Sequence, residues 1–230
     1  MNTAAAYAMD IRAVHRPQKF APLPEDFPFT LETARQVRAF HRTIPGYVPT
    51  PLVSLERLSK LLGVAGLYVK DESARFDLNA FKVLGGSWAA ARYLGQRLGL
   101  GEGELTFSRL TREDWTGLTL VTATDGTPGR GLAWTAQELG IGCGGLITAG
   151  SARERLEHIR ALGARAEITD RNYDDTVRLA AQYAREHGGV LMQDTTVSGG
   201  PGYEEIPTHI MQGYMTMADE AAEQLPAPPT

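Results

Sequence analysis

Segments of β-strand character alternate with segments of helical character through the second half of this chain. Strands are expected at Leu118–Thr124, Gly144–Thr148, Arg165–Thr169 and Val190–Gln193, and helices between them at Arg130–Leu139, Ala152–Leu162 and Tyr173–His187. Short β-branched runs separated by longer amphipathic stretches indicate strand–helix–strand units and a parallel sheet. Right-handed crossovers place helices on both faces of such a sheet, so the sequence predicts a three-layer αβα arrangement.

Ligands of parallel α/β sheets gather beyond the carboxyl ends of the strands. Two loops occupy such positions here. One is Thr124–Gly131, and the other begins at Asp194 and continues to Tyr203. We therefore expect a binding site at this edge of the sheet.

The flanking regions differ from this core. The stretch from Arg16 to Pro51 carries many of the 13 prolines and predicts an extended arm. Further elements are expected as helices at Glu32–Phe40, Leu55–Leu62, Asn79–Leu98 with Asn79 as N-cap, and Glu204–Leu225, and as a strand at Gly66–Lys70. The last helix runs into a proline-rich ending that cannot extend a helix.

Composition narrows the class of ligand. The 230 residues are 43% hydrophobic with a net charge of -4, which offers no basic surface for nucleic acid or an anionic membrane. No uncharged stretch reaches the roughly 18 residues of a membrane span. Cys143 is the single cysteine, so we expect it to pack in the core; no zinc-type cluster, and hence no metal site, is expected. A cytoplasmic protein with a small-molecule ligand is the expectation.

Lys82 is the one cation within the apolar stretch Leu78–Gly86. Desolvation disfavours an ammonium group, so burial here is expected to lower the lysine pKa and free an amine that can form a Schiff base with an aldehyde. The alternative is an ordinary helical lysine that extends its amine into solvent.

The segment Lys70–Gly86 closely resembles the one that carries the Schiff-base lysine in diaminopropionate ammonia-lyases. These are pyridoxal-phosphate (PLP) enzymes of the tryptophan synthase β-like fold, known as fold type II. The resemblance continues in the same order through Ala123–Gly131, Asn172–Arg178, Gln193–Thr195 and Tyr203–Ala218. It implies an α/β fold of this type, of which the chain forms the N-terminal portion.

The resemblance also implies roles for individual residues. Lys82 would hold the aldehyde of PLP, with Phe81, Gly126 and Thr127 in the same cofactor site. The reaction would be α,β-elimination of ammonia from 2,3-diaminopropionate, giving pyruvate and ammonia. Asp125 would take the α-proton of the D enantiomer and Asp194 that of the L enantiomer. The residues alone favour a turn role for Asp125 and a strand-end cap for Asp194, and only the resemblance favours the catalytic roles.

The resemblance further implies a homodimer acting on a small amino acid. It divides the chain into residues 1–85, the first part of a large domain with the extended arm; 86–195, a smaller open α/β domain; and 196–230, an incomplete return to the large domain. Family members continue well past residue 230, so a C-terminal truncation is expected.

Three stretches depart from the family pattern. Thr127-Pro128 stands where the family has Asn-His, and residues 142–145 and 197–202 are unusually rich in glycine. Two other functions stay open: a non-catalytic remnant of the PLP fold, and a dehydratase resembling serine or threonine ammonia-lyases.

Overall fold

The computed structural model describes residues 24, 26–101, 103–195 and 205–228. At its centre lies the expected parallel sheet, with strands β3 (Thr119–Thr124), β4 (Gly142–Ile147), β5 (Arg165–Ile168) and β6 (Val190–Leu191) in the order β5-β4-β3-β6. The predicted strand–helix alternation is therefore confirmed.

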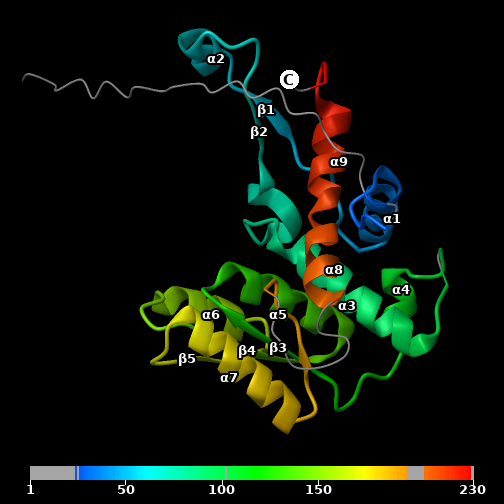
Figure 1. Cartoon of the computed structure of the whole chain (residues 1–230), viewed down its shortest axis with the longest axis vertical. Coiled ribbons are helices and arrows are strands. Elements are labelled where there is room, and N and C mark those ends of the chain that lie inside the picture. The colour runs from blue at the N-terminus through cyan, green and yellow to red at the C-terminus, as the bar shows by residue number, and fades with distance from the viewer. Residues whose placement is uncertain (1–23, 25, 102, 196–204, 229–230) are drawn as a thin grey trace, which may run out of the picture.

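Helices cover both faces of this sheet (Figure 1). On one face lie α5 (Thr127–Leu139) and α6 (Arg153–Arg160), which share a hydrophobic core with Leu120. On the other lies α7 (Tyr173–Glu186), which packs on Val121 and Ala123. Alternate residues of β3 thus face opposite helix layers, as a sheet buried on both sides requires. The three-layer αβα prediction is confirmed.

The chain adds strands to the sheet first on one side of β3 and then on the other. The chain passes from β3 to β4 to β5, crosses the sheet through α7, and returns as β6 on the other side of β3, where Leu120 pairs with Val190. The loops after β3 and β6 therefore leave the sheet side by side. Such a topological switch point is where ligands of parallel α/β sheets bind.

A second group of helices packs against α5. Its members are α1 (Leu31–His41), α3 (Lys82–Leu98), α8 (Glu205–Gly213) and α9 (Met215–Gln224). Helices α3 and α8 cross closely because glycines lie at the contact: a Cβ at Gly213 would collide with the carbonyl oxygen of Leu84, and one at Gly85 would lie 2.5 Å from Cε1 of Tyr214. The small residues of α3 are thus needed for its packing.

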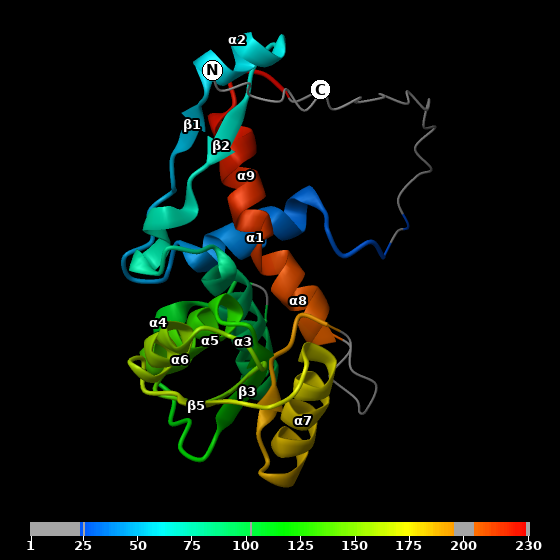
Figure 2. The ribbon, with the colours of Figure 1, turned by 90° about the vertical axis from the view of Figure 1, so that its left-hand side faces the viewer.

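An antiparallel pair, β1 (Leu52–Ser54) and β2 (Tyr68–Lys70), projects from the helices. The helix α2 (Glu56–Leu62) connects the two strands and lies at the tip of the projection (Figures 1 and 2). A buried ionic cluster joins its base to α9. Glu220 contacts Arg75 and Lys70 at 2.8 Å each, and Arg75 also pairs with Glu72 at 2.8 Å. The negative charges of two carboxylates are matched by the positive charges of two cations, as a buried ionic cluster requires.

Several expected elements differ in detail. Asn79 is not an N-cap: α3 begins at Lys82, and Asn79 has a φ of 54°. The expected helix Glu204–Leu225 is two helices, because the chain turns at Tyr214 between α8 and α9. The short elements β1, η1 (Glu72–Asp77) and α4 (Phe107–Leu110) were not predicted, since three to six residues show no measurable period.

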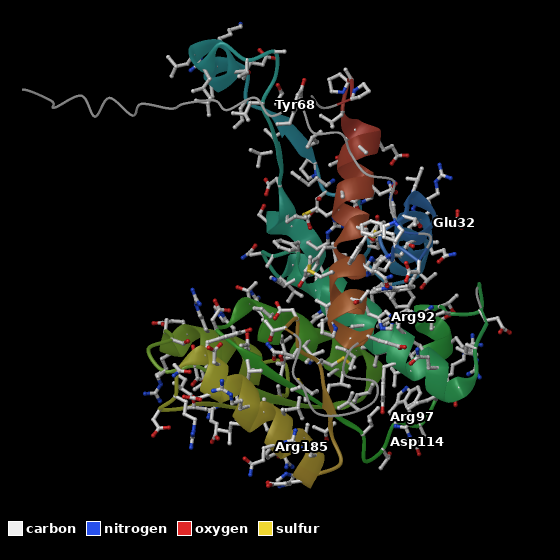
Figure 3. All side chains as sticks on the ribbon, viewed as in Figure 1. Glu32, Tyr68, Arg92, Arg97, Asp114 and Arg185 are labelled. Carbon is white, nitrogen blue, oxygen red and sulfur yellow. The ribbon has the colours of Figure 1, made fainter. Side chains whose placement is uncertain are left out.

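Other expectations concern single features. Cys143 is buried in the core, as expected, and burial raises the pKa of its thiol to about 12. In the part of the chain that the structure describes, no helix is long and apolar enough to cross a membrane. Both acidic and basic side chains lie on the outer surface, among them Glu32, Arg97 and Arg185 (Figure 3). The loop at 197–202 lies outside the described residues.

Candidate active site

Lys82 is the first residue of α3 and lies beside the carboxyl ends of β3 and β6. Its Nζ is 3.5 Å from Oδ2 of Asp194, and both side chains are about one quarter exposed, 26% and 25%. The rings of Tyr214 and Phe81 lie 4.8 and 5.5 Å from Nζ, measured to their centroids. The structure therefore brings together three of the predicted site residues.

The segment before α3 sets this position. Phe76, Asp77 and Asn79 have positive φ angles, which fold the chain tightly ahead of the helix. A Cβ at Gly131 of α5 would lie 2.7 Å from the backbone nitrogen of Val83. Only glycine allows α5 to approach α3 this closely, and the approach places Lys82 against the end of the sheet.

Asp194 follows β6 and is held by hydrogen bonds from two neighbours. Its Oδ1 accepts from the hydroxyl of Tyr173 and from Nε2 of Gln193, each at 3.4 Å. Gln193 also donates to the Tyr173 oxygen at 2.8 Å, and its own Oε1 accepts from the backbone nitrogen of Ala123 at 3.0 Å. The carboxylate thus presents one engaged oxygen and one that faces Lys82.

The expected lowering of the Lys82 pKa is wrong. Burial does act in that direction, but Tyr214 and the Asp194 carboxylate more than offset it, and the pKa of Lys82 lies above its ordinary value. The physical reason is the nearby negative charge, which stabilises the ammonium form. At neutral pH the side chain is therefore an ammonium ion, and the Asp194 carboxylate lies 3.5 Å from its nitrogen.

Asp125, at the end of β3, lies farther out. Its side chain is 63% exposed and is 3.7 Å from Nη1 of Arg155. The N–H groups of Gly126 and Gly129 both donate to Oγ1 of Thr124 at 2.9 Å, so these glycines shape the turn. The turn leads into α5, and the side chain of Asp125 lies on the solvent-exposed side of the turn.

Two separate cavities lie along this edge. Around Lys82 is a cavity of about 20 Å³ whose wall includes Pro128, Gln193 and Tyr214. Gly126 and Thr127 instead line a neighbouring cavity of about 130 Å³, together with Asn79 and His158. Pro128 sits in the first turn of α5, where its missing N–H costs no helical hydrogen bond.

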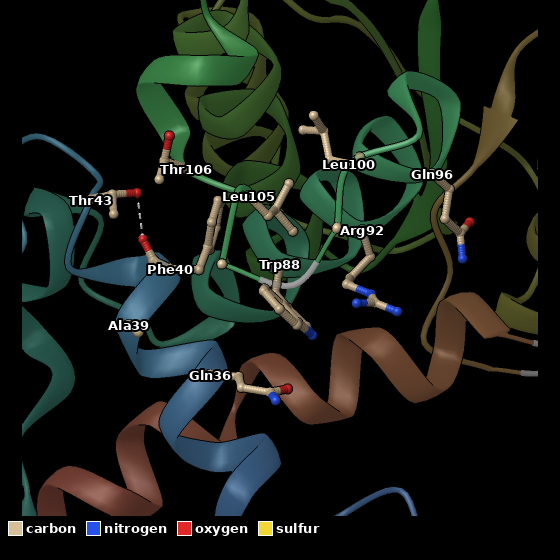
Figure 4. Close-up of a pocket in the computed structure, with 13 residues that line it drawn as sticks. Gln36, Ala39, Phe40, Thr43, Trp88, Arg92, Gln96, Leu100, Leu105 and Thr106 are labelled. Atoms are coloured by element: carbon tan, nitrogen blue, oxygen red, sulfur yellow. Dashed lines mark hydrogen bonds between the residues drawn. The ribbon is translucent and has the colours of Figure 1, made fainter.

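A larger cavity of about 520 Å³ lies between α1 and α3 (Figure 4). Trp88 and Arg92 of α3 face it across from Gln36 of α1, and the Arg92 guanidinium carbon is 5.7 Å from the centroid of the Trp88 ring. None of the predicted site residues is among those that line it. This cavity is therefore distinct from the amine site.

The sequence analysis did not single out Tyr173, Gln193 and Tyr214, which the structure places beside Asp194 or Lys82. Each lies within a segment that carried the family resemblance, but a tyrosine in an amphipathic helix also reads as a packing residue. Only the return of the chain at α8 and α9 shows that Tyr214 faces Lys82.

Comparisons with known proteins identify the family and the fold. Residues 43–230 match the family described as "Pyridoxal-phosphate dependent enzyme". The chain is 49% identical over 197 residues to the diaminopropionate ammonia-lyase of Escherichia coli K12, covering 86% of this chain and 49% of that protein. It spans about half the length of the curated relatives that it matches.

Two solved structures of the Escherichia coli enzyme are also similar. The complex with D-serine superposes with a TM-score of 0.80 at 49% identity, covering 86% of this chain and 50% of that one. The complex with an aminoacrylate-PLP azomethine reaction intermediate gives 0.78 at 48% identity, covering 86% and 49%. The expected N-terminal portion of fold type II is thus confirmed. By its family match and its fold, the chain belongs to the pyridoxal-phosphate dependent enzymes.

Proposed function

We propose that this chain carries the amine and the proton-transfer groups of a site that eliminates ammonia from D- and L-2,3-diaminopropionate. The observation that supports this most directly is the approach of Lys82 Nζ to Asp194 Oδ2, at 3.5 Å, at the switch point of the sheet. The similarity to diaminopropionate ammonia-lyases over 86% of the chain supports the choice of substrate.

The groups around Lys82 fit PLP. A primary amine that is one quarter exposed can condense with an aldehyde, and PLP when bound supplies an electron sink for the α-carbon. The cavity of about 20 Å³ around Lys82 holds little more than the amine, and Phe81 together with Gly126 and Thr127 of the neighbouring cavity of about 130 Å³ would help to hold the cofactor. Thr127 offers a hydroxyl to the ring oxygen.

Proton transfer falls to the chain's own carboxylates. Asp194 Oδ2 is positioned to take the ammonium proton of Lys82. Once that proton has passed to solvent, the regenerated carboxylate would take the α-proton of the L substrate, and the departing β-amine would leave with a proton as ammonia. Asp125, on the open side of the turn after β3, would take the α-proton of the D substrate. Loss of the β-amine as ammonia leaves 2-aminoacrylate, whose hydrolysis releases pyruvate and the second ammonia.

Three further features belong to the proposal. Residues 1–85 and 196–230 form parts of a large domain around α9, and residues 86–195 form the small one around the sheet. The protein forms a homodimer, which sedimentation equilibrium would test. It resides in the cytoplasm, in keeping with a single buried thiol.

Trapping with borohydride tests the proposal. Purified chain is incubated with PLP, reduced and mapped by peptide mass spectrometry, and pyruvate release is followed with each enantiomer. We expect pyridoxyl label on Lys82, loss of both label and turnover in Lys82→Ala, and slower turnover of the D enantiomer in Asp125→Asn. Serine and threonine serve as comparison substrates.

Lys60 provides an internal control, because it is an exposed lysine on α2, far from the sheet. Label spread equally over Lys60 and Lys82 would show nonspecific modification and contradict the assignment. Label on Lys82 without pyruvate from either enantiomer would leave a cofactor-binding protein without the proposed reaction.

A further inference from the structure

Resting on the function proposed above, we propose that Tyr173 is a positioning residue for Asp194. It holds one carboxylate oxygen, so that the other faces Lys82 and the α-carbon of the L substrate. Tyr173 lies on α7, and Asp194 follows β6, so the contact joins the far helix layer to the reacting edge of the sheet.

The argument starts at the amide of Gln193, which is 3% exposed. A backbone N–H can only donate, and the N–H of Ala123 points at Oε1 of Gln193 from 3.0 Å. The Thr122 hydroxyl donates to the same atom at 3.4 Å. These contacts fix the amide orientation, so Nε2, which can only donate, faces the Tyr173 oxygen.

The direction of the next hydrogen bond follows. Because Gln193 Nε2 donates to the Tyr173 oxygen at 2.8 Å, the single hydroxyl proton of Tyr173 is free to point elsewhere. Asp194 Oδ1 lies 3.4 Å away and can only accept when ionised. Burial, then the charges of Asp194 and Asp125, raise the pKa of Tyr173 to about 12, so the hydroxyl keeps its proton at neutral pH.

The two oxygens of Asp194 are therefore not equivalent. Oδ1 is occupied by Tyr173 and Gln193, while Oδ2 stands 3.5 Å from Lys82 Nζ, longer than a tight ion pair. Without the Tyr173 hydroxyl the carboxylate could rotate toward Lys82 and pair with it more closely. That pairing would stabilise the ammonium form and take the base away from the substrate.

Among the described residues, four other charged or titratable groups lie around this carboxylate. They are Lys82 on α3, Tyr214 at the junction of α8 and α9, Tyr173 on α7 and, acting on Tyr173, Asp125 after β3. Of these, only Tyr173 donates to Oδ1 among the described residues. Its removal should act on Lys82 through Asp194.

The test measures Lys82 without cofactor or turnover. The chain is labelled with a trace of acetic anhydride at pH 9, and acetylation of Lys82 is compared with that of Lys60 by mass spectrometry. In Tyr173→Phe the ratio should fall about three- to ten-fold, the change in free amine that a shift of half to one pKa unit produces. Tyr183→Phe, on the same helix and equally exposed, should leave the ratio unchanged.

A double-variant cycle distinguishes positioning from general loosening. Asp194→Asn should raise the Lys82 ratio, and adding Tyr173→Phe in that background should change it no further. Turnover supplies a second readout: Tyr173→Phe should slow the L enantiomer about tenfold or more and the D enantiomer far less.

The inference is overturned if Tyr173→Phe leaves the Lys82 ratio unchanged, or lowers it equally in the Asp194→Asn background. Equal loss with both enantiomers would also overturn it. Absence of pyridoxyl label on Lys82 in the unsubstituted chain would instead refute the proposed function, because the acetylation ratio does not involve PLP.

Discussion

His41 is a fully buried imidazole whose surroundings permit only the neutral form. Its Nδ1 faces the Thr216 hydroxyl at 2.7 Å, and its Nε2 faces the Leu84 carbonyl at 3.1 Å, so Nε2 carries the proton and Nδ1 accepts. The ring thereby joins α1, α3 and α9. Burial lowers its pKa from 6.5 to about 3, and the cation of Arg75 adds to the effect.

This residue makes the fold sensitive to acid. The unfolded chain takes up a proton at His41 below pH 6.5, whereas the folded chain resists it down to about pH 3. The stabilisation is therefore complete above pH 6.5 and is lost as the pH falls, by at most about 1.4 kcal/mol per pH unit. When the free energy of unfolding is measured with urea between pH 7 and 4, it should fall less steeply with decreasing pH for His41→Asn than for the unsubstituted chain.

The exposed His187, the C-cap of α7, supplies the control. His187→Asn should keep the slope of the unsubstituted chain, and an equal flattening in both variants would contradict the role given to His41.

At the scale of elements, two adjacent glycines of α3 differ in how closely neighbouring atoms pack against them. A Cβ at Gly85 would lie 2.5 Å from Tyr214 Cε1 and 2.9 Å from the carbonyl oxygen of Ile210, whereas one at Gly86 would meet nothing closer than 3.5 Å. The crossing of α3 and α8, and with it the place of Tyr214 beside Lys82, depends on the first glycine and not on the second.

Alanine substitutions should separate the two. Gly85→Ala overpacks the crossing and should lower the free energy of unfolding by about 1–3 kcal/mol. Gly86→Ala should leave it unchanged or raise it by up to about 1 kcal/mol, because alanine favours the helix. Denaturant unfolding measures both, and a loss of stability in Gly86→Ala as large as in Gly85→Ala would contradict this account.

The periodic elements were predictable from the sequence because each buries a regular face. The β-branched run of β3 and the amphipathic pattern of α7 suffice for the sheet and its layers. The start of α3 was not, because Phe76, Asp77 and Asn79 before it have positive φ angles, which the sequence pattern does not reveal. Local signals thus leave this boundary open.

The residues of the candidate site likewise divide into those that the sequence predicted and those that it did not. Lys82 and Asp194 were found through family resemblance, and the structure places them together. The pKa of Lys82 was mispredicted, because the sequence shows the apolar neighbours of the lysine but not the carboxylate that folding brings to it. Tyr173 and Tyr214 were missed for a related reason, since their partners lie on other elements.

For the whole molecule, the ionic cluster around Arg75 and Glu220 connects the two ends of the described chain. Burial alone would raise the pKa of Glu220, but Arg75, Lys70 and Tyr47 offset it and lower the pKa to about 2. Removing one partner of a buried ion pair costs about 3–5 kcal/mol, since the other charge is left without compensation.

A shortened chain tests this connection. Ending the chain at Gly213 removes α9 and should expose the pair β1 and β2 to proteolysis and lower the melting temperature sharply. Ending it at Leu225 removes only the proline-rich residues 226–230, of which 226–228 are described and exposed, and should change neither. Equal melting temperatures for the two shortened chains would show that α9 does not anchor the pair.

The same contact has a consequence for biosynthesis. Arg75 leaves the ribosome about 145 residues before Glu220 does, so over that stretch of translation its guanidinium lacks the partner it will be buried with. The projecting strands can be anchored only after α9 has emerged, whereas the four described strands of the parallel sheet have all been made by Leu191. During synthesis α9 thus arrives after the sheet and secures a segment that was made long before it.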